Sequence, residues 1–457
     1  MLTIIAFIVA LGLLIAVHEY GHYRVAVACG VKVLRFSVGF GKSLYTWKPK
    51  KQHPGQDTEF VIGMFPLGGY VKMLDEREGE VAPEERGRAF NTQPLKSRFA
   101  IVAAGPIANL LLATLLYAGV NWIGVQEPQP ILGSPVPGSI AATAGLVGRE
   151  RIERAGFDGE PQVAIQSFEE LRWLMTRGAL DGRDLRMTIT ADSPGGGREL
   201  LLALSQVDAR NADAQMMRKV GVVSPWSPPQ LGDVNADGAA ARAGLRKGDL
   251  VLAVDNQPVV DGQQLRDIIR AQLQGGRALT STWEIQRLGK RLSVQVTPDI
   301  VATDGPPVAR INAFVGATPA MVKMRHGPID GLWKGVVRTW EVSELTLRMM
   351  GRMVIGEASL KNLSGPLTIA DYAGKSASLG FTQYLLFLAL ISVSLGVLNL
   401  LPLPVLDGGH LMYYLWEAVT GRSVSDAWME RLQRGGVAVL LVMMSIALFN
   451  DVTRLFG

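Results

Sequence analysis

Four long runs of residues without a charged side chain most constrain what this chain can fold into. They cover residues 1–17, 99–126, 376–406 and 435–450. A helix needs roughly 20 mainly apolar residues to span a bilayer, so the second and third runs are long enough. The first is long enough if its helix continues past His18 towards Cys29, and the fourth needs flanking residues or a thinner bilayer. We therefore predict four membrane-spanning helices.

A signal peptide and buried core helices both fit these runs less well than membrane spans do. A removed signal peptide needs a basic start and a small-residue cleavage site, and Met1-Leu2-Thr3 offers no basic start. Buried core helices of a soluble protein are seldom so long and so free of charge. Composition agrees, because charged residues make up 19% of the 457 residues, below the ~25% of typical soluble domains. With Cys29 as the single cysteine, an intrachain disulfide framework is excluded.

Lysine and arginine gather at one set of ends of the predicted spans. The clusters follow the first run, precede the second, and lie between the third and fourth: Arg24, Lys32 and Arg35; Lys96 and Arg98; Arg422, Arg431 and Arg434. The positive-inside rule places these clusters in the cytoplasm. Both termini and the segment between the second and third spans then lie in the periplasm of a bacterial cell. The net charge of +5 therefore indicates loops that face an anionic lipid leaflet, and we expect no nucleic-acid partner.

The predicted periplasmic segment contains an internal repeat. Ala144-Gly145-Leu146 recurs as Ala243-Gly244-Leu245, and Asp158-Gly159-Glu160-Pro161 as Asp255-Asn256-Gln257-Pro258. Such a repeat indicates two copies of one module. The second copy, with its Lys247-Gly248-Asp249 turn before an apolar strand, resembles a circularly permuted PDZ domain, whose sheet edge accepts an extended peptide.

The first copy departs from this pattern. Gly148-Arg149-Glu150 replaces the turn, and Arg151, Glu153 and Arg154 interrupt the expected strand. We therefore expect a peptide ligand, if there is one, at the second copy. A pair of PDZ-like folds that filters partners by size without binding a ligand is an equal alternative.

His18-Glu19-Tyr20-Gly21-His22 forms the pattern HExxH at the end of the first run. Residues four apart share one face of a helix, so both imidazoles can bind one Zn²⁺. Glu19 lies beside that site and can move a proton from an attacking water to the leaving amine. The pattern is short, but such residues are costly in a membrane span unless they serve a site. The alternative is a pair of interfacial histidines beyond the end of the helix.

A catalytic zinc needs a third protein ligand. The third run ends in the sequence NLLPLPVLDGGH, residues 399–410, in which Pro402 and Pro404 break any helix. Broken backbone at membrane depth is tolerated where it lines a wet cavity, so we predict an extended loop that carries Asp407 into the bilayer. Both motifs lie at cytoplasmic ends of their spans, so Asp407 can meet the two histidines. Asp407 is the expected third ligand, and His410 competes for that role.

Together these motifs resemble the site-2 protease family of intramembrane zinc metalloproteases, over nearly the whole chain. The resemblance also includes three shorter segments: residues 105–109 (GPIAN), 38–41 (VGFG) and 363–366 (LSGP). It implies that His18, His22 and Asp407 hold zinc, that Glu19 is the general base, and that Asn399 contacts the substrate backbone. It further implies a membrane-associated hairpin loop at Gly39, Phe40 and Gly41, which we expect to contact the substrate.

A helical substrate must be unwound before cleavage, because helical backbone satisfies its own hydrogen bonds. An edge strand within residues 33–45 is expected to accept the unwound segment by strand addition, with a plain cytoplasmic hairpin as the alternative. Asn399 is open to a second interpretation, as a helix C-cap. Residues 330–363 have the spacing of an amphipathic helix, which is either a gate over the site or a docked connector to the third span.

The expected fold is a polytopic α-helical membrane protein with four transmembrane helices, two periplasmic PDZ-like α/β domains and a small cytoplasmic-side membrane-associated β-hairpin region. The expected parts are a first transmembrane helix at 1–28, a β-rich region at 29–97, a second transmembrane helix at 98–122, PDZ-like domains at 127–220 and 221–310, an amphipathic connector at 325–375, a third helix with its loop at 376–406 and a fourth helix at 433–452.

The expected function is zinc-dependent hydrolysis of peptide bonds in transmembrane segments of single-span proteins of the bacterial inner membrane. The resemblance implies substrates of the anti-sigma-factor class, already cut outside the membrane during the envelope stress response, and remnant signal peptides. A non-catalytic PDZ scaffold or chaperone is the main alternative, and it predicts neither bound zinc nor a product. A transporter predicts an inverted repeat of membrane segments, and the sequence contains a repeat only in the predicted periplasmic segment.

Overall fold

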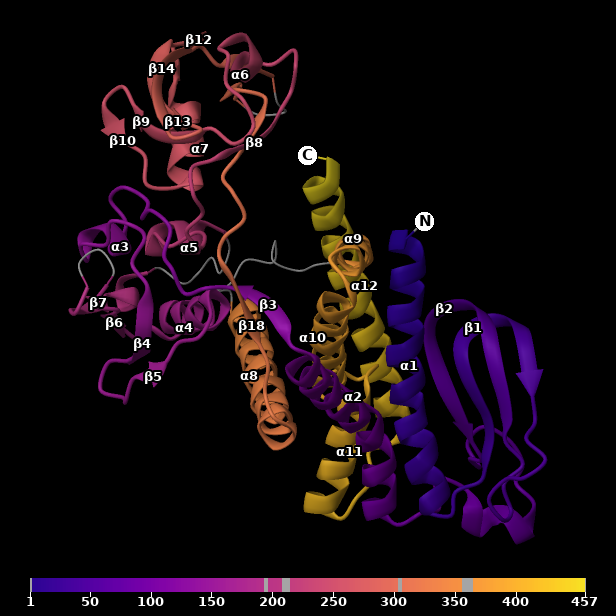
Figure 1. Cartoon of the computed structure of the whole chain (residues 1–457). Coiled ribbons are helices and arrows are strands. Elements are labelled where there is room, and N and C mark those ends of the chain that lie inside the picture. Colours follow the sequence, from indigo (N-terminus) through magenta and orange to yellow (C-terminus); the bar gives the residue numbers. More distant parts are fainter. Residues whose placement is uncertain (1, 193–195, 208–213, 303–305, 356–364, 457) are drawn as a thin grey trace. The chain divides into compact units, whose positions relative to one another are not determined.

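The computed structural model describes residues 2–192, 196–207, 214–302, 306–355 and 365–456. The chain divides into two compact units, one formed by residues 1–125 and 325–457 and the other by residues 126–324. The first unit is mainly helical and carries one β-hairpin, and the second contains the small sheets of the repeat (Figure 1).

The helical unit holds the longest helices of the chain. Its described helices are α1 (Leu2–Ala28), α2 (Leu95–Ile123), α8 (Pro328–Val354), α9 (Pro366–Ser378), α10 (Phe381–Asn399), α11 (Asp407–Thr420) and α12 (Asp426–Phe456). Its hairpin consists of β1 (Val33–Trp47) and β2 (Glu59–Met73), and a short 3-10 helix covers Pro83–Arg88.

Four of these helices are long and apolar enough to cross a membrane: Leu2–Ala28, Leu95–Ile123, Phe381–Leu400 and Ala427–Thr453. The prediction of four spans is therefore confirmed by length and composition. The first helix continues past His18 to Ala28, as its length required. The fourth starts at Ala427, ahead of its uncharged run, so its helix includes the flanking residues that the run alone lacked.

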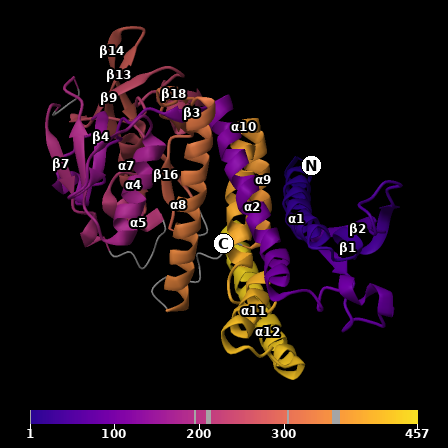
Figure 2. The same cartoon turned by 90° about the horizontal axis from the view of Figure 1, so that it is seen from below.

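Helix α2 lies at the centre of the helical unit and packs against α1, α8 and α10 (Figure 2). Glycines allow the close approaches. A Cβ on Gly21 of α1 would lie 2.5 Å from the Ala104 carbonyl oxygen, and one on Gly335 of α8 would lie 2.7 Å from that of Thr114. Small residues at helix interfaces are the usual means of tight packing in membranes.

The amphipathic segment expected at residues 330–363 forms α8, a helix docked on α2 and α10. Trp333, Trp340 and Leu347 are exposed on its other side. Residues 356–364 lie outside the described residues, and they include the end of the expected segment and the first two residues of the LSGP motif.

The helix that follows, α9, is capped by a residue from far along the chain. Asp451 of α12 is buried, and its carboxylate accepts hydrogen bonds from the backbone N–H groups of Gly365, Leu367 and Thr368 at 2.9–3.1 Å. The first N–H groups of a helix have no partner within it, so a carboxylate there is stabilising. This contact fixes the end of α12 to the start of α9.

The hairpin is a four-stranded arrangement made from two bent strands. Residues 33–38 of β1 pair with residues 69–73 on one side and residues 59–62 on the other, and residues 43–47 pair with residues 60–63. Gly39 and Gly41 have φ of +96° and +85°, and this left-handed backbone lets β1 fold back on itself. The expectation of a free edge along residues 33–45 is therefore wrong for residues 33–38. The described edges are residues 43–47 and the second half of β2.

The second unit contains short helices and strands. Its first half has β3 (Val125–Pro128), α3 (Ile140–Thr143), β4 (Ile152–Phe157), β5 (Val163–Ala164), α4 (Phe168–Asp181), β6 (Leu185–Ile189), β7 (Glu199–Leu202), a 3-10 turn at Leu204–Gln206 and α5 (Ala214–Val220). Its second half has β8 (Leu231–Val234), α6 (Ala239–Arg242), β9 (Leu250–Val254), β10 (Gln257–Pro258), α7 (Gly262–Ala271), β11 (Leu273–Gln274), β12 (Arg277–Ala278), β13 (Ser281–Arg287), β14 (Lys290–Val296), β15 (Asp299–Val301), β16 (Val308–Arg310), β17 (Ala313–Val315) and β18 (Met321–Met324).

The sequence repeat corresponds to a structural repeat. One four-stranded sheet has the order β5-β4-β6-β7 and the other β10-β9-β13-β14, each with one helix inserted before its third strand in sequence. Those helices, α4 and α7, start with the same device: Ser167 accepts from Glu170 N–H, and Asp261 accepts from Gln264 N–H. In return, the side chain three residues after each cap accepts a hydrogen bond from the backbone N–H of the residue before the cap, much as in a capping box.

The turn that differs in sequence between the copies keeps a buried acidic acceptor in both. Glu150 is fully buried and accepts from the N–H groups of Val147 and Gly148, as Asp249 accepts from Arg246 N–H. The charged residues expected to interrupt the strand of the first copy do not prevent β4, because Glu153 and Arg154 are exposed.

In the second copy, burial raises the pKa of Asp249, but hydrogen bonds from Arg287 and from Arg246 N–H outweigh burial and hold that pKa below its usual value.

Candidate metal centre

Two buried histidines of α1 lie one helical turn apart with their side chains together. The Nε2 atoms of His18 and His22 are 3.2 Å apart, and both residues are less than a tenth exposed. The remaining nitrogen of each ring faces α2. His22 Nδ1 lies 2.8 Å from the Ile101 carbonyl oxygen, which can only accept, so His22 carries its proton on Nδ1. Its Nε2 is then a free lone pair, as a metal ligand requires.

Asn109 of α2 contacts the other histidine. Its Nδ2 lies 3.2 Å from His18 Nδ1, and its Oδ1 is buried without a hydrogen bond from the described residues. Turning this amide by half a rotation brings Oδ1 to the Nδ1 proton, which leaves His18 Nε2 free to bind. The sequence singled out residues 105–109 by resemblance without giving Asn109 a role.

Asp407 completes the cluster from the opposite end of the chain. Its Oδ2 lies 3.1 Å from His18 Nε2 and 3.5 Å from His22 Nε2. Asp407 is the first residue of α11, after a loop that is compact rather than extended as predicted: Leu406 N–H bonds to the Leu403 carbonyl at 2.9 Å. The two prolines end α10, and the following residues form turns rather than a strand.

The three atoms fit a metal ion. A tetrahedral ion with bonds of ~2.0–2.1 Å holds its ligand atoms about 3.3 Å apart, which is close to the three separations here. Asp407 Oδ2 is buried and has no hydrogen bond from the described residues. Gly105 leaves the necessary space, since a Cβ there would lie 2.2 Å from His22 Nε2. Among the described residues this is the one group of three that can hold a metal.

His410, the competing ligand, is outside that group. Its ring lies edge-on to Tyr413 with centroids 5.9 Å apart, and burial lowers its pKa. Cys29 is also outside that group and is partly buried among the apolar residues that join the end of α1 to β1 and α2.

Glu19 follows His18 on α1 and is half-buried beneath the hairpin. A Cβ on Gly69 of β2 would lie 2.8 Å from Glu19 Cγ, so the backbone of β2 passes directly over this side chain. The second half of β2 is also the edge of the sheet nearest to α1. An acidic group, two imidazoles and an unpaired strand edge therefore lie together.

The remaining predicted site residues lie in two other elements of the helical unit, α10 and β1. Asn399 is the last residue of α10, seven residues of loop and turn before α11. Gly39 and Gly41 form the bend in β1, and Phe40 between them is 46% exposed and stacks on Tyr70 with centroids 6.1 Å apart. The glycines are thus explained by backbone geometry, and their contact with a substrate stays a prediction.

Helix α11, which carries Asp407, is held at its other end by an ion pair. Arg98 of α2 makes two hydrogen bonds to Glu417, at 2.6 and 3.3 Å, and its guanidinium lies 5.1 Å from the centre of the Tyr414 ring. Both charged side chains are less than a quarter exposed. In the sequence, Arg98 stands out only as part of a basic cluster, and no signal marks Glu417.

Removing one partner of this pair should destabilise the helical unit. We expect Arg98→Gln or Glu417→Gln to cost about 1–2 kcal/mol, because each leaves a partly buried charge without its bonds. The double variant should cost less than the sum. Thermal unfolding in detergent measures this, with Glu430→Gln as control, since its pair with Arg434 is more than half exposed and should contribute little. Equal effects in all variants would contradict the assignment.

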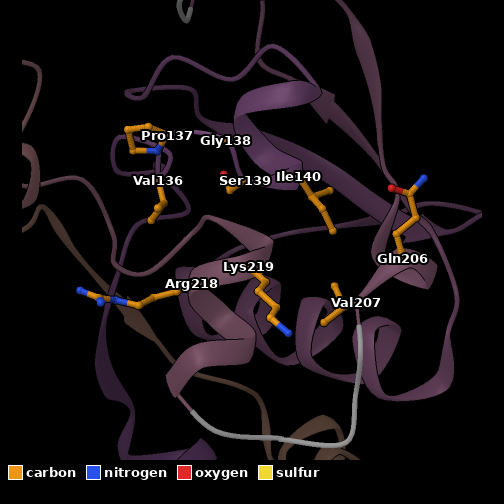
Figure 3. A pocket seen from close by; sticks show the side chains of 9 residues that line it. All are labelled: Val136, Pro137, Gly138, Ser139, Ile140, Gln206, Val207, Arg218 and Lys219. Carbon is orange, nitrogen blue, oxygen red and sulfur yellow. The ribbon is translucent and has the colours of Figure 1, made fainter.

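A separate hollow of about 480 Å³ lies on the first copy of the repeat. Figure 3 shows Val136, Ile140 and Val207 around it, with Lys219 beside Val207 while the Arg218 guanidinium points away. This hollow lies on the first copy, whereas the sequence pointed to the second for peptide capture.

Comparison with known proteins agrees with the chemistry of the centre. The model of peptidase family M50 matches residues 6–443. A protein of Ralstonia nicotianae named as a zinc metalloprotease is 42% identical over 100% of this chain and 99% of its own length. The regulator of sigma E protease of Salmonella typhi is 39% identical, and the regulator of sigma-E protease RseP of Escherichia coli 38% identical, each over 98% of both chains.

These matches cover both units and include the helices that carry the histidines and Asp407. Four apolar spans and relatives of this kind also make the chain a multi-pass protein of the inner membrane. The chain therefore belongs to peptidase family M50, and it is a site-2 intramembrane protease that depends on zinc.

Proposed function

We propose that His18, His22 and Asp407 hold the zinc and that Glu19 is the general base of this protease. The observation that carries the proposal is the convergence of three buried ligand atoms, from α1 and α11, at mutual distances of 3.1–3.5 Å. The bond to the Ile101 carbonyl supports it, because it leaves His22 Nε2 free. With its amide turned as described above, Asn109 does the same for His18 Nε2.

The chemistry needs one proton carrier. Bound zinc would polarise the scissile carbonyl and make a water acidic enough to attack it. Glu19 takes a proton from that water as the C–O bond forms and gives it to the amide nitrogen as the C–N bond breaks. Glu19 thereby returns to its starting charge, and the products are a carboxylic acid and an amine.

The substrate segment is proposed to lie along the second half of β2. An unwound segment that adds to this edge as a strand places its carbonyls beside Glu19, since Gly69 lies against that side chain. This edge replaces the one expected within residues 33–45, of which residues 33–38 lie between two partners. Asn399, at the end of α10, is proposed to hydrogen-bond the freed backbone, and the Gly39–Phe40–Gly41 bend to contact the same segment.

The basic clusters support a cytoplasmic position for the centre and a periplasmic one for both termini and residues 126–324. There the two copies are proposed to be PDZ-like domains that exclude substrates with a large periplasmic domain, with a peptide ligand of the second copy as the alternative. Relatives named regulator of sigma E protease support substrates of the anti-sigma-factor class.

A test substrate with one span checks the proposal. We expect the purified protein to cut it within the membrane segment, as shown by product masses. A folded domain fused to its periplasmic end should slow cleavage strongly, and the same domain on its cytoplasmic end should not. Cleavage outside the membrane segment would contradict the proposed function, and equal rates for both fusions would contradict the filter and its orientation.

A further inference from the structure

The flank of the α1–α2 pair contains a groove that the catalytic mechanism does not use. It has a volume of about 520 Å³, within the roughly 300–1,000 Å³ of ligand pockets. Seven lining residues come from α2 and five from α1, and all but Tyr20 and Arg24 are apolar or glycine. Neither His18 nor His22 lines it.

The groove exists because its floor is small and its rims are large. Gly21 forms the close contact between the helices with Ala104 and Ala108, and the small side chain of Ala100 leaves space beside it. Exposed side chains form the rims: Tyr20 (51%), Phe99 (43%), Ile107 (48%) and Leu111 (60%). Both helices are candidate membrane spans, so a groove with exposed apolar rims faces lipid tails rather than water.

One end of the groove carries a charge. Arg24 lies four residues before the end of α1, is exposed, and has no acidic partner within the described residues. An arginine in a span is costly unless it finds a counter-charge or reaches the headgroup region. Arg98, at the same end of α2, already has Glu417. Arg24 therefore offers its guanidinium to a partner outside the protein, at headgroup depth.

We propose that this groove binds one anionic phospholipid, with an acyl chain between α1 and α2 and the phosphate paired with Arg24. A second protein helix fits the observations less well, because it would bury the Arg24 charge without a phosphate. The floor of the groove lies next to the metal centre, since Gly21 precedes His22 and Ala104 precedes Gly105. A bound lipid thus supports the helix contact behind both histidines.

Native mass spectrometry of the full chain tests the proposal. Delipidated protein is mixed with phosphatidylglycerol or phosphatidylcholine, and the bound lipids are counted. We expect one retained phosphatidylglycerol and weaker retention of phosphatidylcholine. Arg24→Gln should weaken phosphatidylglycerol binding about fivefold, the contribution of one basic residue at a membrane surface. Arg422→Gln, an exposed arginine elsewhere, should leave it unchanged.

A second variant tests the groove itself. Ala100→Leu fills the space for the chain and should lower retention of both lipids, while zinc content and thermal unfolding show that the protein is still folded. Equal phosphatidylglycerol binding by wild type and Arg24→Gln would overturn the proposal. So would a dimer whose cross-links run through the groove, because a second copy would then be the occupant.

Discussion

Replacing Glu19 with glutamine is expected to abolish cleavage while the protein keeps its zinc. Glutamine has nearly the same shape but cannot accept a proton from the attacking water. General acid–base catalysis typically contributes a hundredfold to ten-thousandfold in rate, and we expect a loss in that range. The cleavage rate of a single-span test substrate and the zinc content per chain measure the two halves of this prediction.

The control is Glu430→Gln, which makes the same chemical change in an exposed pair on α12 and should leave the rate unchanged. Turnover at the wild-type rate in Glu19→Gln would contradict the role of the general base. Loss of zinc together with activity would also contradict it, because Glu19 would then be holding the metal centre together rather than moving a proton.

Adding a single methyl group at Gly105 is expected to prevent zinc binding at the metal centre. The Cβ of Gly105→Ala would lie 2.2 Å from His22 Nε2 and 2.8 Å from His18 Cε1. These ring atoms cannot yield easily, since His22 is tied to the Ile101 carbonyl and His18 to Asn109 on the same helix. We expect zinc content and cleavage to fall together to near zero, although alanine is the better helix former by about 1 kcal/mol.

Gly119→Ala is the matched control, because it makes the same change in the same helix where a Cβ meets nothing within 4 Å. It should keep full zinc and activity and slightly raise the thermal midpoint. Full zinc in purified Gly105→Ala would show that the histidines do not sit against α2 as described.

The spans and the metal residues could be predicted because each has a local signal. An uncharged run is visible in the chain itself, and HExxH places two imidazoles on one helical face wherever the helix goes. Asp407 followed from topology, because two prolines must break α10 at the same side of the membrane. The four long apolar helices agree with the predicted spans, and the structure brings the three predicted ligand atoms together.

The supports of the centre could not be predicted in the same way. Ile101 and Asn109 meet the histidines through the register of α1 on α2, and that register is set by the contact of Gly21 with Ala104, which no periodicity reveals. The strand edge was misplaced for a related reason. Two glycines fold β1 back, so that residues expected at an edge lie between two partners.

The repeat shows how a changed residue can keep a role. Glu150 replaces the aspartate of the second copy, yet it accepts the same kind of backbone hydrogen bonds in the same turn. The longer side chain reaches the N–H groups of the turn from a backbone with Arg149 at φ +72°. The sequence difference therefore says little about whether the first copy forms its fold.

Zinc-edge X-ray absorption on the purified full-length protein tests the central claim most directly. We predict zinc bound to two imidazole nitrogens and carboxylate oxygen at ~2.0–2.1 Å, with zinc content falling sharply in Asp407→Ala and unchanged in His410→Ala. Active protein whose zinc shell is the same in wild type and Asp407→Ala would contradict this metal centre.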